Sequence, residues 1–485
     1  MEVTLTVVAG PHEGRVFRFD RHDSFLVGRS KQAQFRLPQK DPHFSRLHFL
    51  IEVNPPLCRL VEMGSTNGTC VNHQSVHDAI ELCDGDRIEA GDTVLRIAIT
   101  GQPQVEHSEL ESVDATRTLP PANPPALFAP DGSIPDAETF VPRHWPKPDE
   151  RRGPSARVPV TGLSVEPANS PAAAVRPVIS PRDASQSDFT DLLPPNHEEL
   201  IAKQPQPISG YLLVDEIGRG GMGVVYRAIC ERPRSVVALK MISPNVAGEH
   251  ADYQRFIREA DIHRNLIHPR IVQCLDVGET SGMLYFAMDF ILGTDAKQFV
   301  KSQGPLPVAQ AVDIVCQLLE ALDYAHGQGY VHRDIKPSNL LLQRVTGRDR
   351  VYLTDFGLAR TYQESRLSGL TMTGDIGGTT PFMPPEQITN YREAKPASDQ
   401  YAAAATLYNL LTGKFVYDFP KQVARQLALI LTRPPVPITQ RRPDIPAALV
   451  DAITRGLARE PEDRFPDVAA FQQALRPFGR HAQFL

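Results

Sequence analysis

The chain has few of the features that mark secreted, membrane or nucleic-acid-binding proteins. It contains 6 cysteines in 485 residues, without paired ligand spacing, so neither a disulfide framework nor a cysteine metal site is predicted. No apolar run approaches 18 residues and no charged-then-apolar leader opens the chain, so no membrane span is predicted. A formal net charge of −6 without a basic run gives no reason to expect nucleic acid as a partner. We therefore expect a cytoplasmic protein with reduced thiols, with two domains joined by a linker.

What the chain does contain is a dense set of polar residues between Tyr330 and Gly357. The set comprises His332-Arg333-Asp334, Lys336, Asn339 and Asp355-Phe356-Gly357. Each tripeptide alone is an ordinary surface or turn sequence, but their conjunction at this spacing is typical of a phosphoryl-transfer centre. Such a reaction has a loose transition state, and a protein assists it mainly by positioning and by neutralising charge.

The residue types suggest a division of roles. Asp334 is placed to orient a substrate hydroxyl and accept its proton, and Lys336 to lie beside the transferred phosphate. Asn339 and Asp355 supply the hard oxygen ligands that Mg²⁺ prefers.

A glycine-rich string, Gly218-Arg219-Gly220-Gly221-Met222-Gly223, predicts the nucleotide half of this centre. Apolar runs on both sides predict two strands, which places the glycines at the tip of a hairpin. Backbone N–H groups at such a tip can lie close over phosphates. A dinucleotide-binding turn would lead from a strand into a helix instead, so a Rossmann fold is disfavoured.

The strand Val236-Val237-Ala238-Leu239-Lys240 ends on a lysine suited to hold the α and β phosphates. Apolar residues at helical spacing from Tyr253 to Ala260 predict a helix, and Glu259 lies beside that stripe. We pair Lys240 with Glu259. The alternative is that Glu259 is a solvated acid on an exposed helix face.

These motifs together make residues 211–478 resemble a eukaryotic-like (Hanks-type) bacterial Ser/Thr protein kinase. The resemblance implies an α+β bilobal fold with ATP between the lobes, Mg²⁺ or Mn²⁺ as the metal, protein substrates, and a transient dimer of kinase domains. Asp334-x-Lys336-Pro337-x-Asn339 is similar to the Ser/Thr form of the catalytic loop. The implied ATP-binding residues are Ile217, Gly218, Gly220, Gly223, Val225, Ala238, Lys240, Met288, Asp289 and Ile291.

Further downstream motifs support the resemblance. Glu386, in Pro385-Glu386, and Arg464 would form an ion pair that braces the large lobe, and Asp399 matches another family landmark. Two departures concern the packing of that lobe: Pro384 replaces the usual alanine, and Ala404 stands where glycine is frequent.

Arg333 and the segment after Gly357 suggest regulation by phosphorylation. An arginine beside the catalytic aspartate gains a partner when a phosphate arrives nearby. Thr371 and Thr373 precede Thr379 by eight and six residues, the spacing at which related kinases autophosphorylate. We predict activation by autophosphorylation at these two threonines.

The first hundred residues have a different pattern, with many short strands separated by polar turns, which predicts an all-β antiparallel sandwich. The clearest predicted strands are 3–7, 16–19, 24–27, 47–51 and 94–97. Three loop sequences carry arginine, small hydroxyls and an amide, which can bind a phosphate dianion. They are Gly28-Arg29, Ser45-Arg46-Leu47-His48 and Gly64-Ser65-Thr66-Asn67-Gly68-Thr69.

With Leu82-x-Asp84-Gly85-Asp86-Arg87-Ile88, these sequences resemble a forkhead-associated (FHA) domain over residues 1–100. The resemblance implies that phosphothreonine peptides bind to Arg29, Ser45, Arg46, Thr66 and Asn67. Gly28, His48 and Ser65 are predicted to shape the loops instead, because small polar residues in tight turns usually bond to their own backbone.

Residues 101–209 hold about 20 of the 44 prolines and show no sustained periodicity. Such a segment cannot bury enough apolar surface to fold, so we predict a disordered tether before a kinase domain at 210–480. Thr116 lies in Asp114-Ala115-Thr116-Arg117-Thr118-Leu119, and with Thr139 it is a predicted phosphothreonine ligand for the FHA domain in cis, favoured by a high effective concentration. These threonines could equally be unmodified linker hydroxyls.

Three functions remain compatible with the sequence: an active Ser/Thr kinase guided by a phosphothreonine-binding module, a phosphate-dependent adaptor with an inactive kinase-like domain, and a small-molecule kinase. Lys240, Glu259, Asp334, Asn339 and Asp355 are all present, whereas inactive relatives usually lack at least one. The segment from Thr371 to Glu386 resembles a platform for protein substrates. The residues therefore favour the active protein kinase.

Overall fold

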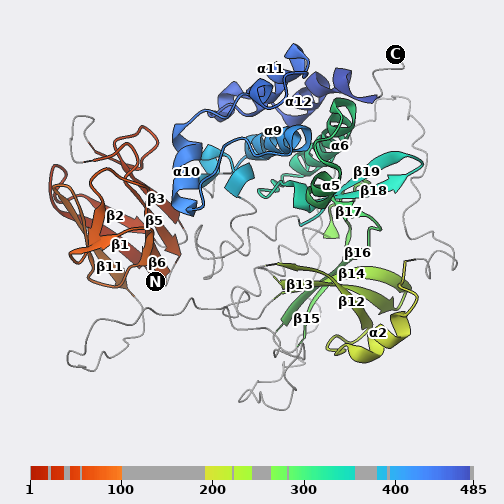
Figure 1. The fold of residues 1–485 in the computed structure, drawn as a ribbon. Helices are drawn as coiled ribbons and strands as arrows, with labels where there is room; N and C mark the ends of the chain where they lie inside the picture. Colours follow the sequence, from red (N-terminus) through yellow and green to blue (C-terminus); the bar gives the residue numbers. More distant parts are fainter. Residues whose placement is uncertain are drawn as a thin grey trace, which may run out of the picture.

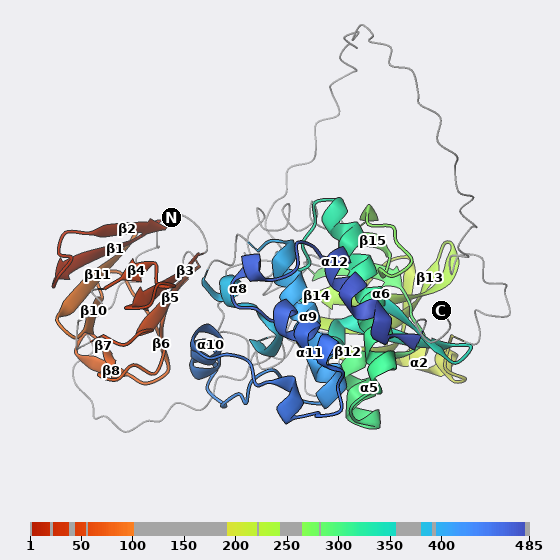
Figure 2. The same ribbon diagram turned by 90° about the horizontal axis from the view of Figure 1, so that it is seen from above.

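A computed structural model describes residues 2–19, 23–37, 44–54, 57–100, 192–220, 223–242, 264–280, 283–355, 380–389 and 394–480. Within these ranges the chain forms a β-sandwich at the N-terminus and a two-lobed unit at the C-terminus (Figures 1 and 2). Most of the predicted tether lies outside the described residues.

The sandwich consists of two mainly antiparallel sheets whose inner faces share one apolar core. The first sheet has the order β2-β1-β11-β10-β7-β8, and the second has the order β4-β3-β5-β6-β9. The sequence of β1 explains why this segment forms a strand on the core. Every second side chain, Val3, Leu5 and Val7, is buried, which is the period of a strand with one face on a core. The bounds are β1 Glu2–Ala9, β2 Val16–Phe19, β3 Asp23–Gly28, β4 Phe35–Arg36, β5 Phe49–Asn54, β6 Leu57–Glu62, β7 Thr69–Val71, β8 Gln74–Val76, β9 Ala79–Glu81, β10 Arg87–Ala90 and β11 Thr93–Thr100. All five predicted strand segments are found, with ends shifted by up to three residues.

The small lobe is an antiparallel five-stranded sheet in the order β12-β13-β14-β16-β15. Its strands are β12 Tyr211–Gly220, β13 Gly223–Glu231, β14 Arg234–Ile242, β15 Cys274–Thr280 and β16 Met283–Asp289. β12 and β13 form the hairpin predicted around the glycine-rich string. The helix predicted from Tyr253 to Ala260 lies outside the described residues.

The end of the predicted tether is folded against this lobe. Helix α2 (His197–Lys203) lies next to β12, and Leu193 is 7% exposed in a cluster with Val214, Ile229 and Val236. The tether therefore ends before residue 192, earlier than the expected boundary at 209. A short apolar pair such as Leu192-Leu193, followed by two prolines, shows no periodicity, which is why the sequence pattern did not predict this contact.

The large lobe is helical and packs around α6 (Val308–Gly327) and α9 (Pro396–Thr412). Nearly every residue of α9 from Ser398 onward is buried, which explains its continuous apolar run of alanine, leucine and tyrosine. A small sheet, β17 (Thr294–Asp295), β18 (Leu340–Val345) and β19 (Arg348–Leu353), lies beside α6. The remaining elements are α5 Ala296–Gln303, η3 Pro337–Asn339, η5 Thr380–Phe382, α8 Pro385–Thr389, α10 Val423–Thr432, η7 Ile438–Gln440, α11 Ala447–Gly456, η8 Pro461–Asp463, α12 Val468–Leu475 and η9 Arg476–Phe478.

Candidate active site and phosphate-binding loops

The catalytic loop lies between α6 and β18 and ends in η3. Asp334 is 7% exposed, and its Oδ2 lies 2.9 Å from Lys336 Nζ and accepts a hydrogen bond from Asn339 Nδ2 at 3.1 Å. Asn339 Nδ2 also donates to the backbone oxygen of Asp334 at 2.9 Å. Within the described part of the chain, the buried Oδ1 of Asp334 accepts no hydrogen bond. One carboxylate oxygen is thus held in place while the other can accept a proton.

Asp399 on α9 accepts hydrogen bonds from the backbone of this loop. Its Oδ1 accepts from Arg333 N at 2.7 Å, and its Oδ2 accepts from His332 N at 2.8 Å and lies 2.8 Å from His326 Nε2. Burial by itself would raise the pKa of Asp399, but the hydrogen bonds and positive charge of His326 and His332 lower it below its ordinary value. The loop is therefore supported by a buried, ionised carboxylate.

Two residues of the site, Arg333 in the catalytic loop and Asp355 after β19, have a strained backbone that the surrounding hydrogen bonds hold in place. Arg333 has φ 69° and Asp355 has φ 63°, a left-handed conformation that costs free energy for residues other than glycine. Asn339 O accepts from Thr354 N at 3.0 Å, which ties the catalytic loop to the strand end that carries Asp355. His332 Nε2 lies 3.0 Å from Thr354 O and strengthens the same connection.

Lys240 on β14 reaches across from the small lobe to Asp355. Lys240 is 7% exposed, and its Nζ lies 2.7 Å from Asp355 Oδ1. Although desolvation would raise the pKa of Asp355, the charge and hydrogen bond of Lys240 lower it, with smaller contributions from Lys336 and His332. The predicted partner Glu259 lies outside the described residues, so the pairing of Lys240 with Glu259 stays a prediction.

Asn339 and Asp355 suit a hard divalent cation. Because Asn339 Nδ2 is bonded to Asp334, its amide oxygen is the atom left for a metal ion, and Asp355 carries an ionised carboxylate. An amide oxygen and a carboxylate are oxygen ligands of the type that Mg²⁺ and Mn²⁺ take.

The structure brings the predicted ATP-binding residues of the small lobe onto one sheet. In β13 and β14, Val225 pairs with Lys240, and Ala238 pairs with Met288 of β16. Gly218 and Gly220 pair with Val225 and Gly223 across the hairpin. Gly223 has φ 142°, and a Cβ there would lie 1.9 Å from Met241 O, so only glycine fits.

The remaining predicted nucleotide contacts flank this sheet. Ile217 on β12 is 41% exposed and lies directly before Gly218 of the glycine-rich string. Asp289 ends β16, and its N donates to Gln273 O at 3.0 Å, while Ile291 follows two residues later.

The ion pair predicted between Glu386 and Arg464 is confirmed. Arg464 Nη1 and Nη2 lie 2.7 and 2.9 Å from the two carboxylate oxygens of Glu386, and the Arg464 side chain is fully buried. The departure at Ala404 is matched by glycine on the facing helix. A Cβ on Gly456 of α11 would lie 2.9 Å from the Ala404 Cβ, so Gly456 makes room for the alanine.

The phosphothreonine-binding loops predicted for the sandwich lie together at one end of its second sheet. Ser45 Oγ accepts from Thr66 N at 2.8 Å and lies 3.3 Å from Thr66 Oγ1, and Arg29 N donates to Ser45 O at 3.1 Å. Arg46 and Asn67 are exposed on the same loops. The three sequence motifs thus form one polar surface.

Gly28 and His48, which were predicted to shape these loops, do so, whereas the buried Oγ of Ser65 has no hydrogen-bond partner among the described residues. A Cβ on Gly28 would lie 2.3 Å from Arg46 O, so glycine is required for the loops to meet. His48 Nδ1 accepts from Ser45 N at 3.2 Å, and His48 Nε2 lies 3.0 Å from Gly68 O. Ser65 N donates to Glu62 Oε1 at 2.6 Å. Glu62, which also accepts from Thr69, was not predicted, because an acid at the end of a strand carries no motif signal.

Four predicted phosphorylation sites, Thr116, Thr139, Thr371 and Thr373, lie outside the described residues.

His326 was not predicted as a site residue from the sequence, although it contacts Asp399. Its position at the end of α6, six residues before His332, would have been the only available signal.

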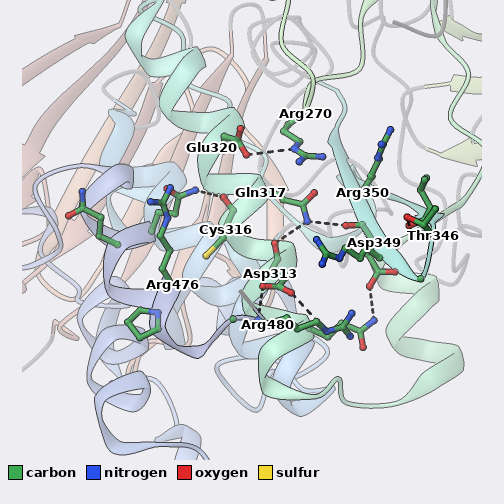
Figure 3. A pocket seen from close by; sticks show the side chains of 18 residues that line it. Arg270, Asp313, Cys316, Gln317, Glu320, Thr346, Asp349, Arg350, Arg476 and Arg480 are labelled. Atoms are coloured by element: carbon green, nitrogen blue, oxygen red, sulfur yellow. Dashed lines mark hydrogen bonds and ion pairs between the residues drawn. The ribbon is translucent and has the colours of Figure 1, made fainter. Parts of the chain in front are cut away.

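A hollow of about 1090 Å³ lies apart from the catalytic loop, between α6, the β18–β19 hairpin and η9 (Figure 3). Many of its charged groups interact with one another. Arg270 Nε lies 3.6 Å from Glu320 Oε2, and Arg480 Nε lies 3.9 Å from Asp313 Oδ2. None of the predicted site residues lines it.

The model for the protein kinase domain family matches residues 211–476, and the model for the FHA domain matches residues 25–91. Serine/threonine-protein kinase PknD of Mycobacterium tuberculosis is 42% identical over 256 residues, which cover 53% of this chain and 37% of PknD. PknF of the same organism is 37% identical over 272 residues, which cover 55% of this chain and 56% of PknF. The crystal structure of the M. tuberculosis PknI kinase domain is 30% identical, covers 56% of this chain and 98% of that domain, and gives a TM-score of 0.45.

The two-lobed fold and the catalytic loop between its lobes define the class of a protein kinase. The family match covers more than half of the chain, and the chain therefore belongs to the protein kinase family; an FHA domain precedes its kinase domain. Members of this family use ATP and a divalent metal ion. The chain spans between about a third and just over half of the length of these two curated relatives. Among the described residues, no helix combines the length and apolar character that crossing a bilayer requires.

Proposed function

We propose that this chain is a Ser/Thr protein kinase that transfers the γ-phosphate of ATP to hydroxyl groups of protein substrates, with Mg²⁺ as its metal ion. The observation that carries the proposal is the geometry of Asp334. One oxygen is bonded to Lys336 and Asn339, and the other is buried without a hydrogen-bond partner among the described residues. A general base needs this arrangement, because it must be fixed in position and still have an acceptor for the proton.

The remaining residues take complementary roles in the proposal. Lys240, which lies 2.7 Å from Asp355, would hold the α and β phosphates. Asn339 and Asp355 would ligate Mg²⁺, and a metal ion there would neutralise charge on the transferred group. Lys336 lies close enough to Asp334 to stabilise negative charge on the phosphate.

Incubation of the full chain with ATP and Mg²⁺, followed by mass-spectrometric mapping of phosphorylated residues, tests the proposal. Asp334→Asn should lower the rate by about 10²- to 10⁴-fold, the usual contribution of a general base. Asp323→Asn, on an exposed position of α6, is the matched control and should keep full activity. Absence of phosphate transfer by the unmodified chain with Mg²⁺ or Mn²⁺ would instead favour an adaptor with an inactive kinase-like domain.

We further propose that phosphorylation of Thr371 and Thr373 activates the kinase and that the FHA domain binds phosphothreonine through Arg29, Ser45, Arg46, Thr66 and Asn67. Arg333 precedes the catalytic Asp334, so a phosphate near it would be coupled to the catalytic loop. The chain with Thr371→Ala and Thr373→Ala should lose most of its activity. Full activity without phosphate in this segment would contradict the proposal.

Thr116 and Thr139 are proposed as ligands of the FHA domain in cis, and a cytoplasmic location and a transient kinase dimer stay predictions from the sequence. Phosphopeptide mapping of the same reactions decides the first point. Phosphate at either threonine that disappears in Asp334→Asn supports the cis ligand, and its absence at both contradicts it.

A further inference from the structure

The second sheet of the FHA domain has buried apolar residues on both faces. Its inner face carries Phe25, Phe49 and Leu60, which belong to the sandwich core. The neighbouring residues Leu26, Leu50, Val61 and Ala79 lie on the outer face, because successive side chains of a strand point to opposite sides. These four residues are direct cross-strand partners, Leu26 with Leu50, Leu50 with Val61, and Val61 with Ala79. They form one continuous row, which we call the outer row.

The kinase domain covers this row. Leu26, Leu50 and Val61 are each 0% exposed, and they belong to the same contiguous apolar cluster as Ile388 of α8 and Leu427 of α10. Contacts join β3 to α8. Both ribbon views place α10 of the large lobe beside the sheet that contains β3 and β5, and Figure 2 shows α8 there as well (Figures 1 and 2).

A polar contact fixes the same interface. Gln34 Oε1 accepts from Leu26 N at 2.8 Å, and Gln34 Nε2 donates to Ser24 O at 3.3 Å. The same Nε2 donates to Thr389 O at the end of α8. The last carbonyl groups of a helix have no partner within the helix, so Gln34 supplies a hydrogen bond that α8 cannot make itself.

Apolar residues of the phosphate-binding loops continue the surface. Ala33 lies four residues after Arg29, Leu47 lies between Arg46 and His48, and Met63 comes directly before Gly64. All three belong to the same apolar cluster as the outer row. Three of the four strands that carry the outer row, β3, β5 and β6, therefore also adjoin the phosphothreonine loops. Soluble domains rarely leave such a contiguous apolar patch in water.

We propose that the outer row is a docking surface for the α8–α10 face of the chain's own kinase domain. The FHA domain is then a fixed part of the large lobe and not a module that moves freely on a tether. In this arrangement the domain covers α8, whose Glu386 anchors the large lobe through Arg464, and it denies the α8–α10 face to other proteins. Its phosphothreonine loops are held at the edge of the same interface.

Hydrogen–deuterium exchange on the full chain tests the docking. In Leu50→Asp, a charge in the centre of the outer row should separate the domains and raise the exchange rate of amides in α8 and α10 by about tenfold or more. The matched control is Val16→Asp, at an apolar position of the first sheet that is 46% exposed, which should change neither helix. Amides in β1 and β11 report whether the sandwich itself stays folded.

A second variant, Ala79→Arg, guards against loss of the FHA fold in Leu50→Asp. Ala79 is partly buried at the end of the row, so an arginine there wedges the interface without entering the sandwich core. Unchanged exchange in α8 and α10 in this variant, with β1 and β11 protected, overturns the proposal. Light scattering should give the mass of one chain, 53.6 kDa; a dimer mass that Ala79→Arg converts to monomer means docking between two copies and also overturns the proposal.

Discussion

The catalytic loop and the loops that we propose to bind phosphothreonine are held in place differently. The catalytic loop depends on partners far along the chain. Asp399, which accepts from His332 N and Arg333 N, lies more than sixty residues away from them and is buried. In the FHA domain the supports are closer along the chain: Ser65 N bonds to Glu62 three residues earlier, Ser45 N bonds to His48 three residues later, and Ser45 Oγ accepts from Thr66 N 21 residues later.

The difference follows from what each site must do. Phosphoryl transfer needs groups fixed in a desolvated position before the substrate arrives, and buried charges from distant helices provide this. Recognition of a phosphothreonine needs accessible donors, and Arg46, Thr66 and Asn67 are accordingly exposed. We therefore expect substitutions in the long-range supports of the kinase to cost more free energy than substitutions in the local supports of the FHA loops.

The largest effect should come from Arg464→Met. This change leaves Glu386 without its buried bidentate partner, and breaking a buried pair costs about 3–5 kcal/mol. Denaturant unfolding of the full chain, followed by a signal from the kinase domain, measures the loss. Glu199→Gln is the control, because Glu199 and its partner Lys203 on α2 are 63% and 65% exposed, and an exposed pair of this spacing contributes about 0.5 kcal/mol or less. Equal losses of unfolding free energy in the two variants would contradict the idea that burial of the Glu386–Arg464 pair makes it strongly stabilising.

Asp399→Asn should cost about 3 kcal/mol at neutral pH, since two backbone N–H groups and His326 lose a charged acceptor. The pKa of Asp399 is lowered in the folded protein, so its contribution is present above its unfolded pKa of about 4 and is lost as the pH falls through the folded pKa. The difference in stability between the unmodified chain and the variant should therefore shrink below about pH 4. Thermal unfolding from pH 7 to pH 3 measures this, and a pH-independent difference would show that Asp399 acts without its charge.

The contrast between long-range and local support also explains what the sequence could predict. Asp334, Lys336, Asn339 and Asp355 lie in one short segment, so their spacing predicts a phosphoryl-transfer centre, whereas the roles of Arg29 and Ser45 were predicted through the resemblance to FHA domains. The contacts of Asp399 with the catalytic loop depend on how α9 packs under it, which no local pattern encodes. The Glu386–Arg464 pair was predicted only through the family resemblance.

The docked face of the FHA domain shows a second limit. The runs Phe25-Leu26-Val27 and Phe49-Leu50-Ile51 predict strands, but unbroken apolar runs are typical of strands buried on both faces. A sandwich of two sheets accounts for only one buried face of these strands. The sequence pattern does not say which element covers the second face, because this depends on the position of α8 and α10 in space.

Arg29→Ala should weaken binding of a phosphothreonine peptide by about 10- to 150-fold, the loss expected for a hydrogen bond to a charged group worth about 1.5–3 kcal/mol. Fluorescence anisotropy with a labelled peptide and its unphosphorylated form measures the change. Arg96→Ala, on an exposed position of β11, is the control and should bind normally. Binding that is independent of the phosphate, or unaffected by Arg29→Ala, would remove the assigned role.

The smallest effect should come from Thr69→Val, which removes a hydrogen bond to Glu62 but keeps the shape of a side chain that is 1% exposed. We expect a loss of about 1 kcal/mol in the stability of the FHA domain, because Glu62 still accepts from Ser65 N. Peptide binding should change by less than tenfold. Thr100→Val, at the exposed end of β11, should stay within about 0.5 kcal/mol of the unmodified chain. If Thr69→Val were as destabilising as Asp399→Asn, separation along the chain and burial of a charge would not be what distinguishes the two phosphate sites.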